Sequence, residues 1–296
     1  IRKQLDHHRT LAGQPHSDGP GQPKPSVKAD LYMRIFDSHC HLDDNCYRED
    51  WDTVMNRADA NEVCAMMVVG VGRASSERAL DLARRHANLF ASVGIHPHDA
   101  SSCDDALLDQ LQALSRDPNV RAWGEAGLDF NRMFSPREAQ ERCFVRQLEI
   151  ADSLNLPLIF HERDSGGRFR ELLATTPSRN RRGVVHCFSG SREEMLAYLD
   201  MGLHIGITGI LTIKGRGKQL RELVKEVPLE RLLVETDAPY LTPTPERNRF
   251  RRNEPAFVRT VLLRLAEVLE IDAEELADRI WQNTCDLYGL PRDPVA

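Results

Sequence analysis

The chain has 296 residues, of which 41% are hydrophobic and 28% charged, and its formal net charge is −6. These proportions are sufficient for a large hydrophobic core, and they exclude global disorder and a collagen-like repeat. An acidic chain is a poor candidate for a basic protein that coats duplex DNA. The longest apolar run, at 63–71, is far shorter than the roughly 20 residues that a membrane helix needs.

The cysteines and the N-terminal residues bear on the compartment of the protein. Its seven cysteines include no CxxC pair, which predicts reduced thiols and not a disulfide framework. The N-terminal residues lack the apolar segment of a secretory signal. We therefore expect a cytoplasmic protein with no membrane association and no obligate protein partner.

Residues 1–32 differ in composition from the rest of the chain. They contain four prolines and three glycines but few large apolar residues, which predicts a disordered N-terminal extension. Three histidines in this stretch are better explained by a solvated tail than by a metal site. Met33 stands just before the first predicted strand, and we expect it to be the natural start of the protein.

From Met33 onward, short apolar runs alternate with longer amphipathic segments. The runs predict strands at 34–37, 63–71, 91–95, 120–124, 158–160, 183–185, 204–208 and 232–234. Helical periodicity is seen between them at 75–87, 104–115, 137–155 and 191–201. A last helix is predicted to begin after Asp272 as its N-cap and to end just before Gly289. Eight such units predict one domain over 33–296, a single (β/α)8 TIM barrel. The alternative, a doubly wound sheet, would be favoured by a glycine-rich nucleotide loop after the first strand, and the sequence has none.

Polar residues that suit metal binding stand at the carboxyl ends of these strands. His39 and His41 project to the same side of an extended segment, since side chains alternate along a strand. The later strands end near His96 and His98, Glu125 and Asp129, His161, His186, and Asp237. The intervals between them match one or two βα units, which brings all of them to the catalytic rim of a barrel.

The residue types indicate hydrolytic chemistry. Four histidines and two carboxylates suit a pair of divalent ions, with Glu125 placed centrally to bridge them. Two such ions lower the pKa of a shared water and stabilise a developing oxyanion. Asp237 is placed to hold one ion and to accept a proton from the attacking water. Zn²⁺, Mg²⁺ and Mn²⁺ all remain candidates for these two ions.

Five motifs occur in order: DSHCHLD at 37–43, GIHPH at 94–98, GEAGLD at 124–129, HCFSG at 186–190 and ETDAPYL at 235–241. Together they closely resemble the TatD family of metal-dependent hydrolases, over nearly all of the chain after Met33. The resemblance implies a TIM barrel of the amidohydrolase-like superfamily and a deoxyribonuclease activity. By motif position it implies the metal ligands His39, His41, Glu125, His161, His186 and Asp237, with His96 as a site residue near the substrate.

Two details of the sequence concern the substrate. Glu162 follows His161 where the family usually has a small residue, and Ser165 stands where Ala is common. An added carboxylate beside a ligand is expected to alter substrate preference. After the eighth strand, four arginines and Phe250 fall within 247–252, and we expect Arg249 and Arg252, together with His98, to bind substrate.

The favoured hypothesis is a two-metal phosphodiesterase that digests DNA from an end or as single strands, most simply an exonuclease. A first alternative is an ester or amide hydrolase on the same metal centre, such as a D-aminoacyl-tRNA deacylase. A second alternative is a metal-holding scaffold without turnover. The complete ligand set argues against the scaffold, because a purely structural site needs no open coordination position.

Overall fold

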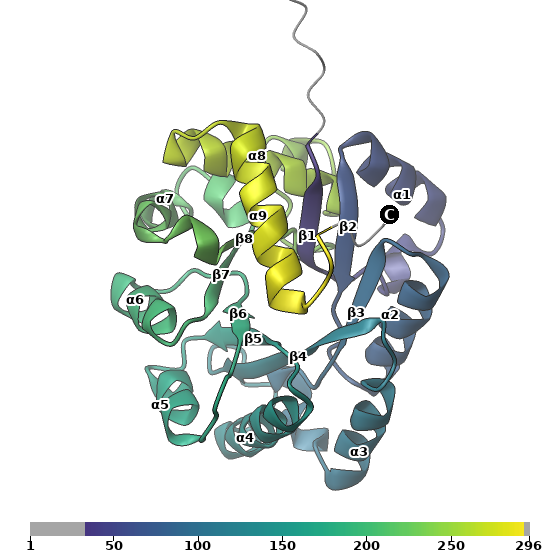
Figure 1. Cartoon of the computed structure of the whole chain (residues 1–296), viewed down its shortest axis with the longest axis vertical. Helices are drawn as coiled ribbons and strands as arrows, with labels where there is room; N and C mark the ends of the chain where they lie inside the picture. The colour runs from purple at the N-terminus through teal and green to yellow at the C-terminus, as the bar shows by residue number, and fades with distance from the viewer. Residues whose placement is uncertain (1–32, 293–296) are drawn as a thin grey trace, which may run out of the picture. The chain divides into compact units, whose positions relative to one another are not determined.

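The computed structural model describes residues 33–292, so the predicted extension over 1–32 lies outside the described part of the chain. Eight strands form one parallel sheet in the order β1 to β8 (Figure 1). They are β1 Ile35–Cys40, β2 Val63–Val68, β3 Leu89–Val93, β4 Val120–Asp129, β5 Leu158–Arg163, β6 Gly183–Val185, β7 His204–Ile207 and β8 Leu232–Val234.

The first and last strands meet and close the sheet into a barrel. Cys40 forms a parallel bridge with Ala238, and the amide of His41 donates to the carbonyl of Ala238 at 2.7 Å. The amide of Asp237 donates to the carbonyl of His39 at 2.9 Å. The predicted (β/α)8 TIM barrel is therefore confirmed, and the closure occurs at the chain segments that carry the candidate ligands.

Helices alternate with the strands and surround the barrel (Figure 1). They are α1 Trp51–Ala60, α2 Arg73–Arg85, α3 Asp105–Leu114, α4 Arg137–Leu154, α5 Arg168–Thr175, α6 Arg192–Asp200, α7 Lys218–Leu223, α8 Val258–Leu269 and α9 Ala273–Tyr288. Short 3-10 segments occur at Asn45–Tyr47, Pro97–Ser102, Gly209–Thr212, Val224–Glu226, Leu229–Arg231, Glu246–Asn248 and Pro255–Phe257.

The fourth strand differs from the expectation. The sequence predicted an end at Gly124, but β4 continues to Asp129 and pairs with β5 at Trp123 and again from Ala126 to Asp129. The small residues there mark a close approach of two backbones and not the end of the strand. A Cβ added to Gly127 would lie 1.8 Å from the carbonyl oxygen of His161, so only glycine allows this pairing.

One apolar layer lies between the strands and the surrounding helices. On α4, Phe144 is fully buried and its ring stacks on Phe169 of α5 with the centroids 5.0 Å apart. Phe160 of β5 meets both rings edge-on. Each such side chain contributes about 1.5–3 kcal/mol through burial. These contacts fix helices α4 and α5 against the strands that carry Glu125 and His161.

A second apolar cluster fills the inside of the barrel and is covered by α9. Phe36 of β1 packs against Trp281 and Tyr288 of α9, with ring centroids 5.8 and 6.3 Å away. In Figure 1, α9 crosses the middle of the view in front of the strands. The helix begins after Asp272, which accepts from two amides of the first turn, and ends at Gly289 with φ 62°, as the sequence predicted.

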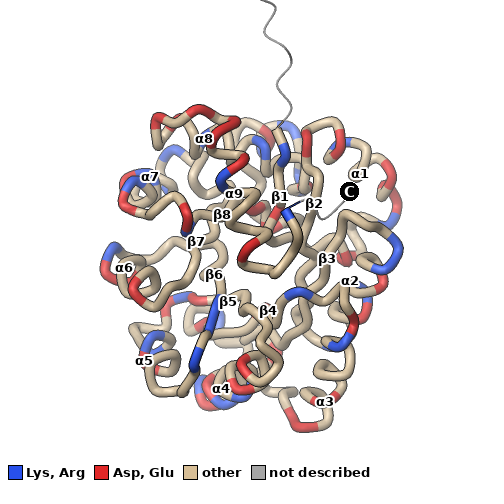
Figure 2. Tube along the Cα trace, viewed as in Figure 1, with Lys and Arg blue, Asp and Glu red and all other residues tan. Residues whose placement is uncertain are grey.

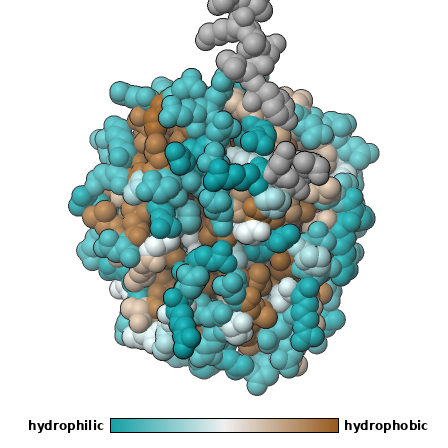
Figure 3. All heavy atoms as spheres, in the orientation of Figure 1, coloured by the Kyte–Doolittle hydropathy of each residue, from teal (hydrophilic) through white to brown (hydrophobic). Residues whose placement is uncertain are grey.

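Charged residues lie mainly on the surrounding helices and loops, while the strands carry few of them (Figure 2). On the face drawn in Figure 3, hydrophilic residues cover the outer rim and hydrophobic residues show between them toward the middle. Among residues 33–292, no helix combines the length and the apolar character needed to cross a membrane.

Candidate metal centre

The strand-end residues predicted from the sequence meet in one cavity of about 750 Å³. Its lining includes His41, His96, His98, Glu125, Asp129, His161, His186 and Asp237. His39 is fully buried beneath this cavity and lies within 3.7 Å of Asp237. The structure therefore brings together all the ligand candidates of five different strand ends, although they are spread over 199 positions of the chain.

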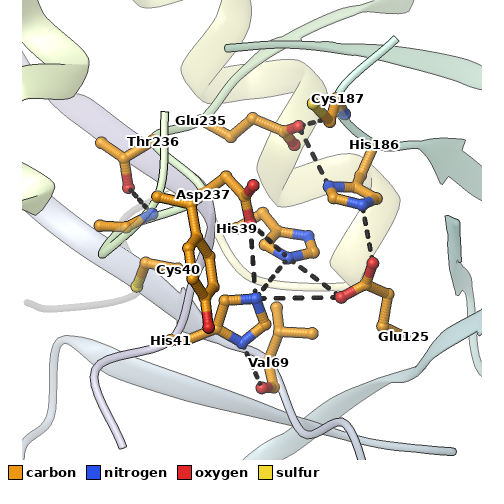
Figure 4. Close-up of polar contacts among 12 residues, drawn as sticks. His39, Cys40, His41, Val69, Glu125, His186, Cys187, Glu235, Thr236 and Asp237 are labelled. Carbon is orange, nitrogen blue, oxygen red and sulfur yellow. Dashed lines mark hydrogen bonds and ion pairs between the residues drawn. The ribbon is translucent and has the colours of Figure 1, made fainter. Parts of the chain in front are cut away.

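The two carboxylate oxygens of Glu125 face different histidines (Figure 4). Oε1 lies 2.6 Å from Nδ1 of His161 and 2.7 Å from Nε2 of His186. Oε2 lies 3.5 Å from Nε2 of His39 and 3.9 Å from Nε2 of His41. The two oxygens of this one carboxylate therefore serve two different groups of histidines.

Asp237 faces His39 and His41, the two histidines of β1 and its end, from a direction opposite to that of Glu125. Its Oδ1 lies 3.5 Å from Nε2 of His41 and 3.7 Å from Nε2 of His39. The residue adopts the left-handed region with φ 56°, and its amide is held by the carbonyl of His39. A non-glycine residue in this region is uncommon, and such positions concentrate at functional sites. The turn directs Asp237 back toward the barrel axis, immediately after β8.

Three groups of side chains place their ligand atoms within 4.8 Å of one another. These groups are His39, His41 and Asp237; His96, Glu125 and His161; and His39, His186 and Glu235. Imidazole nitrogens and carboxylate oxygens are the donors that divalent metals take in proteins. The nitrogens of His39 and His41 approach to 3.3 Å, as do those of His161 and His186, and a bound cation would stabilise this crowding.

The electrostatics of the cluster favour positive charge at His41 and His186, whereas burial lowers the pKa of His39. Burial lowers the pKa of His41, but Asp237 and Glu125 outweigh it and raise that pKa to about 9. Burial also opposes charge on His186, yet Glu125 and Glu235 raise its pKa well above the ordinary value. The carboxylates thus hold cationic groups in a buried place, and a divalent ion supplies the same charge. The donor set therefore fits a metal centre.

Glu235 belongs to this site and was missed by the sequence analysis. It is fully buried, its Oε1 accepts from the amide of Cys187 at 2.5 Å, and the same oxygen lies 3.6 Å from Nδ1 of His186. A Cβ on Gly206 would lie 2.6 Å from its carboxylate, so the glycine leaves space for it. The signal was available, since Glu235 and Asp237 are two residues apart.

His96 and His98 take different positions in the cavity. Nε2 of His96 lies 3.5 Å from Glu125 and 3.3 Å from Nδ1 of His161, so His96 lies directly beside the ligand cluster. Burial lowers the pKa of His96 to about 4 against the opposing effect of Glu125. His98 pairs with Asp129 at 2.8 Å, and Asp129 also lies 3.5 Å from Nε2 of His161. Asp129 therefore holds two histidines in place.

The arginines that follow β8 differ from the expected arrangement. Arg252 pairs with Asp50 at 2.6 Å and with Glu254 at 3.0 Å, and its guanidinium lies over the ring of Tyr47. These contacts tie the loop to the barrel and favour a structural role for Arg252. Arg249 is exposed and does not line the cavity.

Other side chains at the rim have properties that suit a polyanion. Arg132, Arg163 and Arg216 line the cavity, are exposed, and have no ion-pair partner within the described part of the chain. Phe134 is 67% exposed and meets His98 edge-on, while Tyr240 is 56% exposed and meets His41 edge-on. Exposed aromatic rings on both sides of the cluster have no packing explanation.

The sequence family of the chain is decided by comparison with known proteins. The family model described as TatD related DNase matches residues 36–289. The chain belongs to the family of TatD related DNases. This membership confirms the resemblance drawn from the five motifs and makes the chain a hydrolase of the nuclease type.

Among curated TatD relatives, proteins named 3'-5' ssDNA/RNA exonuclease TatD are similar over their whole length. The Citrobacter koseri protein is 42% identical over 259 residues, covering 86% of this chain and 99% of the relative. The Salmonella typhimurium and Escherichia coli K12 proteins are 44% and 41% identical, with the same coverage.

Solved TatD structures agree with this assignment. The TatD homologue YjjV from Escherichia coli K12 superposes with a TM-score of 0.80 at 31% identity, covering 88% of this chain and all of that chain. A TatD family hydrolase from Entamoeba histolytica has a TM-score of 0.79 at 26% identity and covers 88% of this chain and 99% of that one.

Proposed function

We propose that the protein is a metal-dependent 3'-5' exonuclease acting on single-stranded nucleic acid. The observation that carries this proposal is the position of Glu125, whose two oxygens face two separate groups of histidines within 3.9 Å. The relatives are named as exonucleases of this polarity and substrate. Hydrolysis of a phosphodiester suits such a centre, because the reaction needs an activated water and a neutralised phosphate.

Two divalent ions are proposed at the cluster. One would be held by His39, His41, Glu125 and Asp237, and the other by Glu125, His161 and His186. Such ions supply a water of lowered pKa and stabilise charge on the phosphate oxygens. Imidazole-rich sets favour Zn²⁺ over Mg²⁺ in affinity, and Mn²⁺ accepts both donor types, so metal reconstitution has to be tested ion by ion.

The side chains around the ligands have proposed roles of their own. Asp237 lies 3.5 Å from His41 and accepts the proton that the attacking water loses. His96 has a lowered pKa and remains neutral, so its ring donates a hydrogen bond to a phosphate oxygen without adding charge. His98, fixed by Asp129, supports the substrate on the same side of the cavity.

The shape of the site favours an unpaired strand. The ligand side chains are at most 17% exposed and form the floor of the cavity. Phosphates of a duplex follow the outside of a wide cylinder, so a paired strand does not reach such a floor without local opening. We propose that Arg132, Arg163 and Arg216 contact phosphates and that Phe134 and Tyr240 stack on bases, which every base permits through its π face.

The test is a direct comparison of substrates with metal-reconstituted protein. The chain is stripped of metal and reloaded separately with Zn²⁺, Mn²⁺ or Mg²⁺, then assayed on single-stranded DNA, single-stranded RNA, duplex DNA and D-aminoacyl-tRNA. We expect stepwise release of nucleoside 5'-monophosphates from single strands, with blunt duplex DNA digested at least tenfold more slowly. Release of amino acid without release of nucleotides would establish the deacylase alternative instead.

The same proposal includes the compartment. Cys187 carries a free thiol and lines the cavity of the metal centre beside His186, where its oxidation would disturb the neighbouring histidine. A reducing cytoplasm suits such a site. Fractionation of cells with an antibody against the chain measures this directly.

A further inference from the structure

The two departures from the family pattern noted in the sequence lie against each other in the structure. Oε1 of Glu162 accepts from the amide of Ser165 at 3.1 Å and from its hydroxyl at 2.6 Å. Ser165 is buried, and its own hydroxyl oxygen accepts from the amide of Phe169 at the start of α5. The serine thus fixes the carboxylate to the β5–α5 turn.

The fixed carboxylate lines the same cavity as the metal ligands. Glu162 follows His161 directly, and both lie on β5, which runs to Arg163. Both hydrogen bonds from Ser165 end on Oε1 of Glu162. The other oxygen, Oε2, has no hydrogen-bond partner among residues 33–292. Glu162 therefore presents a half-buried negative charge and a free acceptor to whatever enters the cavity.

The other carboxylates of the lining that do not face the ions are differently arranged. Asp43 is paired with Arg78 at 2.9 Å, and Asp129 accepts from His98 at 2.8 Å. Asp99 is exposed and its side chain has no hydrogen bond within the described chain. Asp44 is also half-buried, and its Oδ1 accepts from the amide of Cys46 at 2.8 Å. Glu162 differs from it by directly following a candidate ligand, His161, on β5.

A carboxylate in such a place is unfavourable for a nucleic-acid backbone, since two like charges about 6 Å apart repel by about 1–3 kcal/mol at effective dielectric constants of about 20–60. The group it faces must therefore be a hydrogen-bond donor and not a phosphate. Every internal nucleotide carries a phosphate on its 3' oxygen, and only the terminal nucleotide carries a hydroxyl there. That hydroxyl is a donor of the required kind.

We propose that Glu162, held by Ser165, is a specificity-determining residue that accepts a hydrogen bond from the 3'-hydroxyl of the terminal nucleotide and repels a phosphate at that position. This inference rests on the proposed exonuclease function and deepens it. It gives a physical reason for cleavage at an end: an internal linkage would place the next phosphate against the carboxylate.

The experiment measures binding and hydrolysis of single strands that differ only at the 3' end. Three oligonucleotides of one sequence carry a 3'-hydroxyl, a 3'-O-methyl group or a 3'-phosphate. Dissociation constants come from fluorescence anisotropy of versions with a terminal phosphorothioate linkage, which resists hydrolysis, with metal-loaded protein at pH 8. Hydrolysis rates come from the versions with ordinary linkages.

The wild-type protein should bind the 3'-phosphate strand about tenfold more weakly than the 3'-hydroxyl strand, with the 3'-O-methyl strand between them. Glu162→Gln keeps an oxygen for Ser165 but removes the charge, so the discrimination against 3'-phosphate should fall to twofold or less. Ser165→Ala should reduce it partly, because the backbone amide still holds Oε1. Asp99→Asn is the matched control, since it removes one negative charge from the same lining and should leave the discrimination unchanged.

Equal binding of all three ends by the wild type, or an unchanged preference in Glu162→Gln with a normal melting temperature, would overturn the proposal. Equal effects of Glu162→Gln and Asp99→Asn on the discrimination against 3'-phosphate would also overturn it, because they would show that only the net charge of the cavity matters. Absence of hydrolysis with every metal would refute the exonuclease function, while the ratio of dissociation constants still decides the role of Glu162.

Discussion

The two ends of the barrel interior are built from the same strands but have opposite chemistry. On β1, Phe36 belongs to the apolar cluster covered by α9, whereas His39, three residues later, lies in the ligand cluster. One end is closed by Trp281 and Tyr288, which are almost completely buried. The other end opens into a cavity of about 750 Å³.

Histidines at the two ends show how the environment changes the same side chain. Burial dominates at His204, at the start of β7, and together with Arg231 lowers its pKa to about 4. At His41, the carboxylates of Asp237 and Glu125 outweigh burial and raise the pKa to about 9. The closed end excludes charge and contributes stability, whereas the open end accumulates charge and contributes function. The two tasks are therefore separable by mutation.

The largest expected effect is at the open end. Glu125→Ala removes the carboxylate that faces both groups of histidines, so hydrolysis should fall by at least about 10³-fold and the bound metal should decrease. Unfolding by urea should change little, because the residue does not belong to either apolar cluster. Mass spectrometry measures the metal content, and the rate of nucleotide release measures hydrolysis. The control is Glu230→Ala, because Glu230 is exposed beside β8 at the closed end. Normal turnover with normal metal content would remove Glu125 from the centre.

The converse variant is at the closed end. Trp281→Ala leaves a void against Phe36 and removes the hydrogen bond from Nε1 to the carbonyl of Arg292, so the free energy of unfolding should fall by about 3–5 kcal/mol. Turnover per folded molecule should stay within about threefold of the wild type under conditions where the variant is folded. Urea titration measures the free energy of unfolding. Turnover per folded molecule is the hydrolysis rate divided by the amount of metal-loaded protein. A stable variant that lacks activity would show that the two ends are coupled.

His204 sharpens the contrast through the pH dependence of stability. Its folded pKa is depressed to about 4, so between pH 6.5 and 4 the unfolded chain binds a proton that the folded chain does not. The wild type should therefore lose about 2 kcal/mol from this group as the pH falls from 7 to 4.5, and the stability is retained above pH 6.5. In His204→Gln the decline over this range should be smaller by that amount, which urea titrations at both pH values measure. Equal declines in both proteins would contradict the lowered pKa.

The smallest effect concerns two sets of arginines on the open side. Arg163→Ala combined with Arg216→Ala should weaken single-strand binding about tenfold and flatten the plot of log affinity against log salt by about one unit, since each phosphate contact contributes about −0.7. Arg247→Ala combined with Arg249→Ala, outside the cavity lining, is the matched control and should change the slope little. The opposite result would favour the rim contacts that the sequence predicted for Arg249.

Much of the fold was predictable because strand and helix signals are local. The limits of β6 and β8 and both caps of α9 agree with the sequence, since β-branched runs and capping residues act within a few positions. The predicted end of β4 at Gly124 was wrong, because glycines such as Gly124 and Gly127 are typical of strand ends. Only the close approach of β5 shows that glycine is needed for pairing there.

The sequence by itself determined the barrel, the strand ends that meet, and the residue types of the metal centre, because the spacing of motifs follows the repeat of βα units. Tertiary structure decided what no local pattern contains. It buries Glu235 behind His186, ties Arg252 to Asp50 and Glu254 away from the cavity, and joins Glu162 to Ser165 inside it. The physical reason is that charge and hydrogen-bond pairing depend on which side chains from distant segments face one another, and closure of the barrel sets those neighbours.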